Sequence, residues 1–377
     1  MDTKVLCILT TLLGNKAMAR SLRGALDRVR GVDATFVLLG SEDYSSCPTP
    51  WWARATNPWQ AQFMAHRKAR PFKGRQFDLL LVNSWEHVVA FRHLAHQMPA
   101  AAMLDSVPAT TNCQLRRRGM GGWRRWLSHQ VHHRPFAMAA GEFEVFLPLG
   151  SDCATSLQHD YGVSPERCFV TLAPQDLESW KPASRRYAPP MRLLFAGNDF
   201  ARKGGDFLLR LYSEHLAGAF TLTIASNDST LSGRQLPPGV EWLRGRNREQ
   251  LLEVYRANDV FVFPTRQDYM PQVLAEALAA GLPCLASDIG GIRDLVHEGQ
   301  TGFLMPLDAP AELWAARLHR LAADPVELAR LSARARQFAE QKLGLDRFER
   351  LIADVIERFR VQQKCAPRRR RHDKSGT

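Results

Sequence analysis

Two carboxylates stand eight positions apart in the second half of the chain, Asp268 in a polar turn and Glu276 inside a run of apolar and small residues. The two acids are held at fixed places if that run is a helix opened by Pro271, because a missing N–H is harmless in the first helical turn. A helix this apolar has little reason to carry an acid unless something polar meets it. Glu276 is therefore a candidate binding residue.

A cationic loop precedes these acids in the sequence NDFARKGG, which follows an expected strand at 192–197 (RLLFAG) and leads into a helix expected at Asp206 to Leu216. Two glycines directly before a helix let phosphate oxygens approach backbone N–H groups at the positive end of the helix dipole. Arg202 and Lys203 add positive charge at that end. The loop therefore predicts a phosphate site.

The elements that must position these groups alternate strand and helix. A strand is expected at Val260 to Phe263, then the acid-bearing helix, which Gly281 ends, then a strand at Cys284 to Ala286 and a Gly-Gly loop at Gly290. The same alternation opens the chain between residues 1 and 40, which is typical of a parallel sheet in an α/β domain. A length of 377 residues indicates two such domains.

The run ALAAGLPCLASDIGGIRDLV, followed by GQTGFLMP, resembles glycosyltransferase family 4, whose retaining GT-B members carry an E-x7-E signature. Asp268 stands where that family usually has Glu, and Asn198 stands where Arg is common in its diphosphate loop. PLGSDCATSLQHDYGVSPERCFVTLAPQDLESWKP is also similar to this family. Within it, a helix is expected at Ser151 to Tyr161, capped at its start by Ser151 and ended by Gly162. The resemblance implies an α/β GT-B fold, with two Rossmann-like doubly wound domains facing a central cleft.

The resemblance also implies the domain limits. Residues 1–182 would form an N-terminal acceptor domain, completed by a helix at 346–361 that crosses back to it. Residues 183–345 would form the nucleotide-sugar domain, and 364–377 a basic tail that is expected to be disordered. The tail could touch anionic lipid or stay solvated.

The implied reaction moves a sugar from a UDP- or GDP-sugar to an acceptor hydroxyl, with retention and without a metal or other cofactor. Glu276 would hold the ribose and Asp268 the transferred sugar, while Arg202 and Lys203 would stabilise the departing diphosphate. The expected donor-binding set also includes Gly197, Gly204, Met270, Gln272 and Val273.

Asp105 is the acceptor-side candidate, because it follows an expected strand at Ala100 to Leu104 in a D-x-x-P turn similar to the family's. An acid at the carboxyl end of a parallel strand points into the crevice where such sheets bind ligands. It would orient the acceptor; the alternative is an Asp that caps the next turn.

Residues 113–135 contain no acid and combine cations with aromatic residues at roughly helical spacing, in a chain of formal net charge +12. Such a helix can lie on an anionic membrane or pack its apolar stripe on its own domain. The candidates for an acceptor or membrane contact here are Arg116, Arg117, Trp123, Arg124 and Trp126. The Trp-rich, basic stretch at 41–75 leaves the same two readings open, an interface or a folded loop.

No apolar run approaches the ~18 residues of a spanning helix, so we expect a cytoplasmic protein that can sit at the inner face of a membrane. Seven scattered Cys show no metal spacing. The acceptor would be a glycan or lipid-linked sugar in cell-surface synthesis, and no nucleic-acid partner is expected. Two rivals stay open: a sugar-nucleotide epimerase of the same fold, and a non-enzymatic basic protein that binds lipid or nucleic acid.

Overall fold

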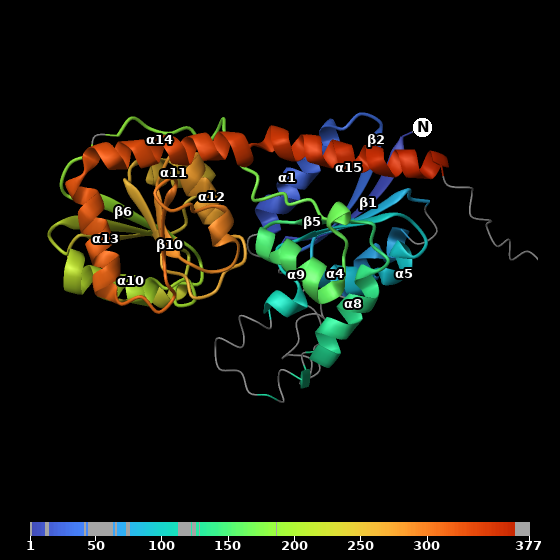
Figure 1. Ribbon diagram of the computed structural model, residues 1–377, viewed down its shortest axis with the longest axis horizontal. Coiled ribbons are helices and arrows are strands. Elements are labelled where there is room, and N and C mark those ends of the chain that lie inside the picture. The colour runs from blue at the N-terminus through green and yellow to red at the C-terminus, as the bar shows by residue number, and fades with distance from the viewer. Residues whose placement is uncertain are drawn as a thin grey trace, which may run out of the picture.

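The computed structural model describes residues 2–11, 15–40, 43, 63–64, 66–72, 76–111, 122, 126–127, 129–185 and 187–365. These residues form two α/β halves that lie side by side, with one long helical stretch running along both (Figure 1). Each half is built on one parallel sheet.

The first sheet has the strand order β2-β1-β3-β4-β5, and all its printed pairings are parallel. Side chains of β1 alternate between two cores: Val5 packs in the cluster that contains Met18, whereas Leu6 packs in the cluster that contains Phe91. Both faces of the sheet are thus covered, as expected of parallel strands. The elements are β1 (Thr3–Thr10), α1 (Asn15–Arg28), β2 (Val32–Leu39), β3 (Leu79–Val82), α4 (Trp85–Ala90), α5 (Arg92–Ala95), β4 (Ala100–Leu104), α8 (Arg134–Ala140), β5 (Val145–Pro148) and α9 (Ser151–Tyr161).

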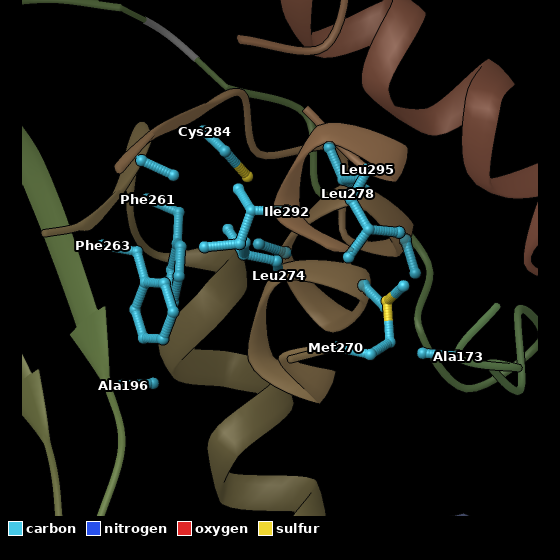
Figure 2. Close-up of a cluster of buried hydrophobic side chains, with 14 of the residues drawn as sticks. Ala173, Ala196, Phe261, Phe263, Met270, Leu274, Leu278, Cys284, Ile292 and Leu295 are labelled. Carbon is cyan, nitrogen blue, oxygen red and sulfur yellow. The ribbon is translucent and has the colours of Figure 1, made fainter. Parts of the chain in front are cut away.

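The second sheet has the order β11-β10-β9-β6-β7-β8. Its central helix α12 packs Leu274 and Leu278 into a buried cluster with Phe261, Phe263 and Ile292 (Figure 2). The elements are β6 (Met191–Ala196), α10 (Gly205–Leu211) with its wider continuation η5 (Tyr212–Leu216), β7 (Phe220–Ala225), β8 (Val240–Leu243), α11 (Arg248–Arg256), β9 (Val260–Phe263), α12 (Gln272–Ala279), β10 (Cys284–Ser287), η7 (Gly290–Asp294), β11 (Gly302–Met305), α13 (Ala311–Ala323) and α14 (Pro325–Lys342).

The last helix, α15 (Leu345–Cys365), leaves the second half and packs against α1 of the first (Figure 1). Arg360 donates to Thr3 Oγ1 at 2.9 Å and to the Gly31 carbonyl at 2.6 Å, and Glu349 pairs with Arg28. The predicted fold class is confirmed: two Rossmann-like parallel-sheet domains with a C-terminal helix that crosses back. The exact domain limits stay a prediction.

Three local predictions differ from the structure. Pro271 is the N-cap of α12, which begins at Gln272. Ser151 is the first residue of α9, and the N-cap is Gly150, which has no side chain to cap with. The helix predicted at 346–361 runs from Leu345 to Cys365, so residues 364 and 365 of the tail expected to be disordered are helical.

Several candidate residues lie outside the described part of the chain: Arg116, Arg117, Trp123, Arg124, the tryptophans of the 41–75 stretch and the tail from residue 366. Trp126 is described and its side chain is exposed. Among the described residues, no helix is both long and apolar enough to cross a bilayer.

Candidate functional site

The candidate site lies where the carboxyl ends of the two sheets face each other. A pocket of about 120 Å³ opens there, and it is lined by residues that follow strands of both domains. The first domain contributes Asp105, Thr110, Gly150, Asp152 and Cys153, and the second contributes Tyr269, Asp288, Ile289, Gly290, Gly291 and Arg293. Ligands of open parallel sheets bind at this edge, so the topology favours this pocket as a ligand site.

The cationic loop and the first acid meet beside this pocket. Lys203 Nζ lies 3.0 Å from Asp268 Oδ2, and Arg202 Nη1 lies 3.9 Å from the same oxygen. Arg202 is further held by the Gln267 carbonyl at 2.6 Å and by Asp199, whose Oδ2 lies 2.6 Å from Arg202 Nε. β6 and β9 are neighbours in the sheet, so the loops that follow them converge. A phosphate entering here would meet cations that are already oriented.

Two glycines of the loop permit this arrangement. Gly204 has φ +80°, and a Cβ there would lie 1.9 Å from the Pro264 carbonyl oxygen. A Cβ on Gly197 would lie 2.4 Å from Lys203 Cδ, in the space that the lysine stem occupies. Both positions therefore need glycine. Gly204 needs it for its left-handed conformation and its close contact with Pro264, and Gly197 needs it so that Lys203 can extend toward Asp268.

Replacing Gly204 by alanine is expected to displace the cationic loop and weaken diphosphate binding at least about 10-fold, because the backbone must move away from Pro264 and strain the left-handed conformation. Gly233 provides a matched control, since it also has a positive φ of +75° but faces open space. Isothermal titration with UDP and GDP would measure the effect. If the alanine variants at 204 and 233 bind equally well, the loop does not hold the diphosphate.

The second acid, Glu276, projects from α12 and accepts a hydrogen bond from the Tyr255 hydroxyl at 3.1 Å. Burial raises its pKa to about 7, although this hydrogen bond and the charges of Arg248, Arg20 and Lys203 oppose the rise. The carboxyl therefore changes charge near neutral pH, and a polar ligand that donates hydrogen bonds would favour its ionised form.

Asp105 lines the pocket from the first domain and accepts a hydrogen bond from Ser106 Oγ at 3.1 Å. Burial raises the pKa of its carboxyl, and the negative charge of Asp268 raises it further. The acceptor-side and donor-side candidates are thus close enough to interact electrostatically across the pocket. A ligand hydroxyl bound between Asp105 and Asp268 could contact both carboxyl groups.

The family match falls in the second domain. The family described as Glycosyl transferases group 1 matches residues 190–324. Residues 190–324 therefore resemble a group 1 glycosyltransferase domain. They contain the cationic loop, Asp268, Glu276 and the Gly-Gly loop in one continuous stretch.

Curated relatives include proteins named D-inositol 3-phosphate glycosyltransferase. The one from Streptomyces bingchenggensis (strain BCW-1) is 31% identical over 230 residues, covering 54% of this chain and 50% of the relative. The one from Rhodococcus erythropolis (strain PR4 / NBRC 100887) is 29% identical over 214 residues, covering 50% and 48%. The chain therefore spans about half the length of the curated relatives it matches.

Solved structures resemble the whole fold. Sucrose-phosphate synthase (tll1590) from Thermosynechococcus elongatus has a TM-score of 0.75 at 14% identity, covering 96% of this chain and all of that one. Anabaena Alr3699/HepE in complex with UDP and glucose has a TM-score of 0.68 at 13% identity, covering 94% and 100%. WaaG, a glycosyltransferase involved in lipopolysaccharide biosynthesis, has a TM-score of 0.68 at 17% identity, covering 94% and 99%. These TM-scores, over nearly the whole chain, show the shared GT-B fold.

The other predicted donor-side residues lie around the start of α12. Met270 is buried in the same cluster as Ala173 of the first half (Figure 2). Gln272 accepts a hydrogen bond from Gln175 Nε2 at 3.3 Å, and Val273 packs partly against the core. These residues therefore lie where the domain meets residues 173–175.

Several residues in and around the site were not predicted from the sequence. Tyr255, which binds Glu276, lies on α11 and carries no local signal of this role. Tyr269 is adjacent to Asp268, and its hydroxyl contacts Thr111 Oγ1 of the first domain at 3.2 Å. Gly290 and Gly291 line the pocket, whereas the sequence predicts only a Gly-Gly loop there and assigns it no binding role. The paired glycines are the sequence signal that could have indicated this position.

Among the described residues, no group of three or more His, Cys, Asp or Glu side chains has the arrangement of a metal site. Independence from metal stays a prediction. Of the candidates for an acceptor or membrane contact, only Trp126 is described, and its side chain is 65% exposed.

Proposed function

We propose that the protein is a retaining glycosyltransferase of family 4 that moves a hexosyl group from a UDP- or GDP-sugar to a hydroxyl of a glycan or lipid-linked acceptor. The observation that carries this is the convergence of Arg202, Lys203 and Asp268 at the carboxyl edge of the second sheet, opposite Asp105. The two cations can bind a diphosphate, and the neighbouring carboxylates can accept hydrogen bonds from the hydroxyls of an attached sugar.

In the proposed reaction the bond between the anomeric carbon and the diphosphate oxygen breaks while a bond to the acceptor oxygen forms. Negative charge develops on the departing diphosphate, where Lys203 and Arg202 stabilise it. The acceptor proton passes to a phosphate oxygen of the leaving group on the same face, so atoms and charge balance without a protein nucleophile. Asp105 orients the acceptor hydroxyl, and Glu276 accepts hydrogen bonds from the ribose.

The acceptor pocket supports a hydroxyl-bearing substrate. Its Asp and Arg residues are Asp105, Asp152, Asp288 and Arg293, and the arginine donates to Asp288 through hydrogen bonds of 2.5 and 3.1 Å. The three carboxyl groups outnumber the one arginine, so this wall accepts hydrogen bonds from sugar hydroxyls and disfavours a phosphate. We place the enzyme in cell-surface glycan or glycolipid synthesis, at the cytoplasmic face of an anionic membrane, because of its net charge of +12.

Thermal unfolding with UDP, GDP and ADP would identify the donor nucleotide. A ligand at 100 times its dissociation constant stabilises the folded protein by ~2.7 kcal/mol, so one diphosphate is expected to raise the melting temperature clearly above the others. Incubation of the matching sugar nucleotide with and without neutral glycan acceptors then separates the rivals. An epimerase converts the donor with no acceptor present, and a basic adaptor responds to none of the three nucleotides.

A further inference from the structure

The two domains are in close contact at one edge of the pocket. A Cβ on Gly150 would lie 2.9 Å from Met270 Cε, 3.0 Å from Asp294 Oδ2 and 3.5 Å from Gly291 Cα. A Cβ on Gly291 would lie 2.5 Å from the Tyr269 carbonyl oxygen. The crowding at Gly291 comes from its own domain, whereas the space beside Gly150 is filled by atoms of the opposite domain, so the β5–α9 turn fits directly against the start of η7.

Asp294 completes this contact. Its carboxylate accepts a hydrogen bond from the Ser151 backbone N–H at 2.6 Å and another from the Ser151 hydroxyl at 2.6 Å. The first N–H groups of a helix lack partners within the helix, and a negative charge is favoured at that end. Because the N-cap of α9 is Gly150, its own side chain supplies no cap. A carboxylate from the opposite domain does so.

The same contact sets the distance between opposing walls of the pocket. α9 carries Asp152 and Cys153, and η7 carries Gly290, Gly291 and Arg293. Ser151 is the first residue of α9, and Asp294 is the last residue of η7. Breaking the pair would release the start of α9 from η7, while the hinge contacts of Gln175 with Leu343 and Leu345 remain.

We propose that Asp294 is a positioning residue that holds the two domains closed by capping α9 across the cleft. It touches neither substrate nor the reacting atoms; it acts through Ser151, by setting the pocket width at which acceptor and donor meet. Its role in catalysis rests on the proposed transfer reaction, whereas its role in closure does not.

The test compares Asp294→Ala with Asp324→Ala in the full chain. Asp324 Oδ1 accepts the Glu327 N–H at 2.9 Å at the start of α14, so the control loses a capping carboxylate inside one domain. Small-angle scattering is measured without ligand and with saturating UDP. We expect Asp294→Ala to increase the radius of gyration in at least one condition and Asp324→Ala to leave it unchanged. Ser151→Ala, which keeps the N–H, should shift it in the same direction by less.

Kinetics provide the second readout. Asp294→Ala is expected to raise the KM for the acceptor about 10-fold or more, the usual scale for losing hydrogen bonds to a charged group, with little change in UDP affinity. Asp294→Asn keeps one acceptor oxygen and should recover part of the loss. Equal scattering for Asp294→Ala and Asp324→Ala in both conditions overturns the proposal, even if transfer occurs. If Asp294→Ala has the larger radius of gyration but the native protein transfers no sugar, the role of Asp294 in closure is supported and the proposed function is contradicted.

Discussion

Replacing Lys203 by methionine is expected to slow sugar transfer by about 10²-fold or more, the scale seen when one charge-stabilising donor is removed from an active site. The Lys203 side chain is 14% exposed, its Nζ lies 3.0 Å from Asp268 Oδ2, and it stands 5.0 Å from the centre of the Phe263 ring. Methionine keeps the apolar stem that packs there and removes only the ammonium. The diphosphate then departs with one cation fewer.

The effect should fall on the rate of the chemical step more than on binding of the intact donor, because charge on the leaving group grows in the transition state. Single-turnover measurements with the cognate sugar nucleotide would separate the two. Arg234→Met is the control, since Arg234 also places a cation near the start of α10, where it pairs with Asp206 at 2.6 Å. If Lys203→Met transfers sugar as fast as Arg234→Met, the leaving group is stabilised elsewhere.

Replacing Glu276 by glutamine is expected to abolish the nucleotide-induced rise in melting temperature and yet to stabilise the ligand-free protein above neutral pH. The folded pKa is about 7 against an ordinary value of 4.5, so between these values the folded state binds more protons than the unfolded state. Stability therefore falls as pH rises from 4.5 to about 7 and stays reduced above. Glutamine removes this loss, which is on the order of 1 to 3 kcal/mol.

Nucleotide binding should show the opposite dependence. Ribose hydroxyls donate to the ionised carboxylate, so the affinity of the native protein should increase from about pH 6 to about pH 8, and the variant should show no such increase. Melting curves at several pH values, with and without the cognate diphosphate, measure both effects. Glu340→Gln serves as the control, because that side chain is 54% exposed. A nucleotide response that survives in Glu276→Gln would exclude the ribose assignment.

The local order of elements could be predicted from sequence because it depends on neighbouring residues. The strand at Val260–Phe263 has the predicted bounds. The acid-bearing helix, expected to open at Pro271, begins one residue later at Gln272. Apolar runs of strand length, helical spacing and glycine or proline at the ends specify such elements within a short window. The alternation of strands and helices along the chain predicts the two parallel sheets.

The partners of the site residues could not be predicted in the same way. Lys203 and Asp268 are 65 residues apart, and they meet because β6 and β9 are neighbours in the sheet. Tyr255 reaches Glu276 because α11 and α12 pack on the same domain. No periodicity within either segment encodes these pairings, which depend on strand order and helix packing.

The start of α9 shows the difference most directly. A serine before an apolar periodic run is a common N-cap, and the sequence predicted Ser151 in that role. In the folded chain Ser151 is the first helical residue, and its N–H is satisfied by Asp294, 143 positions away in the other domain. The sequence by itself determined the strands, helices, cationic loop and paired acids, since short-range sterics and hydrophobic spacing decide those. Only the tertiary structure decided which groups face each other across the cleft, because that depends on how two separately formed sheets pack.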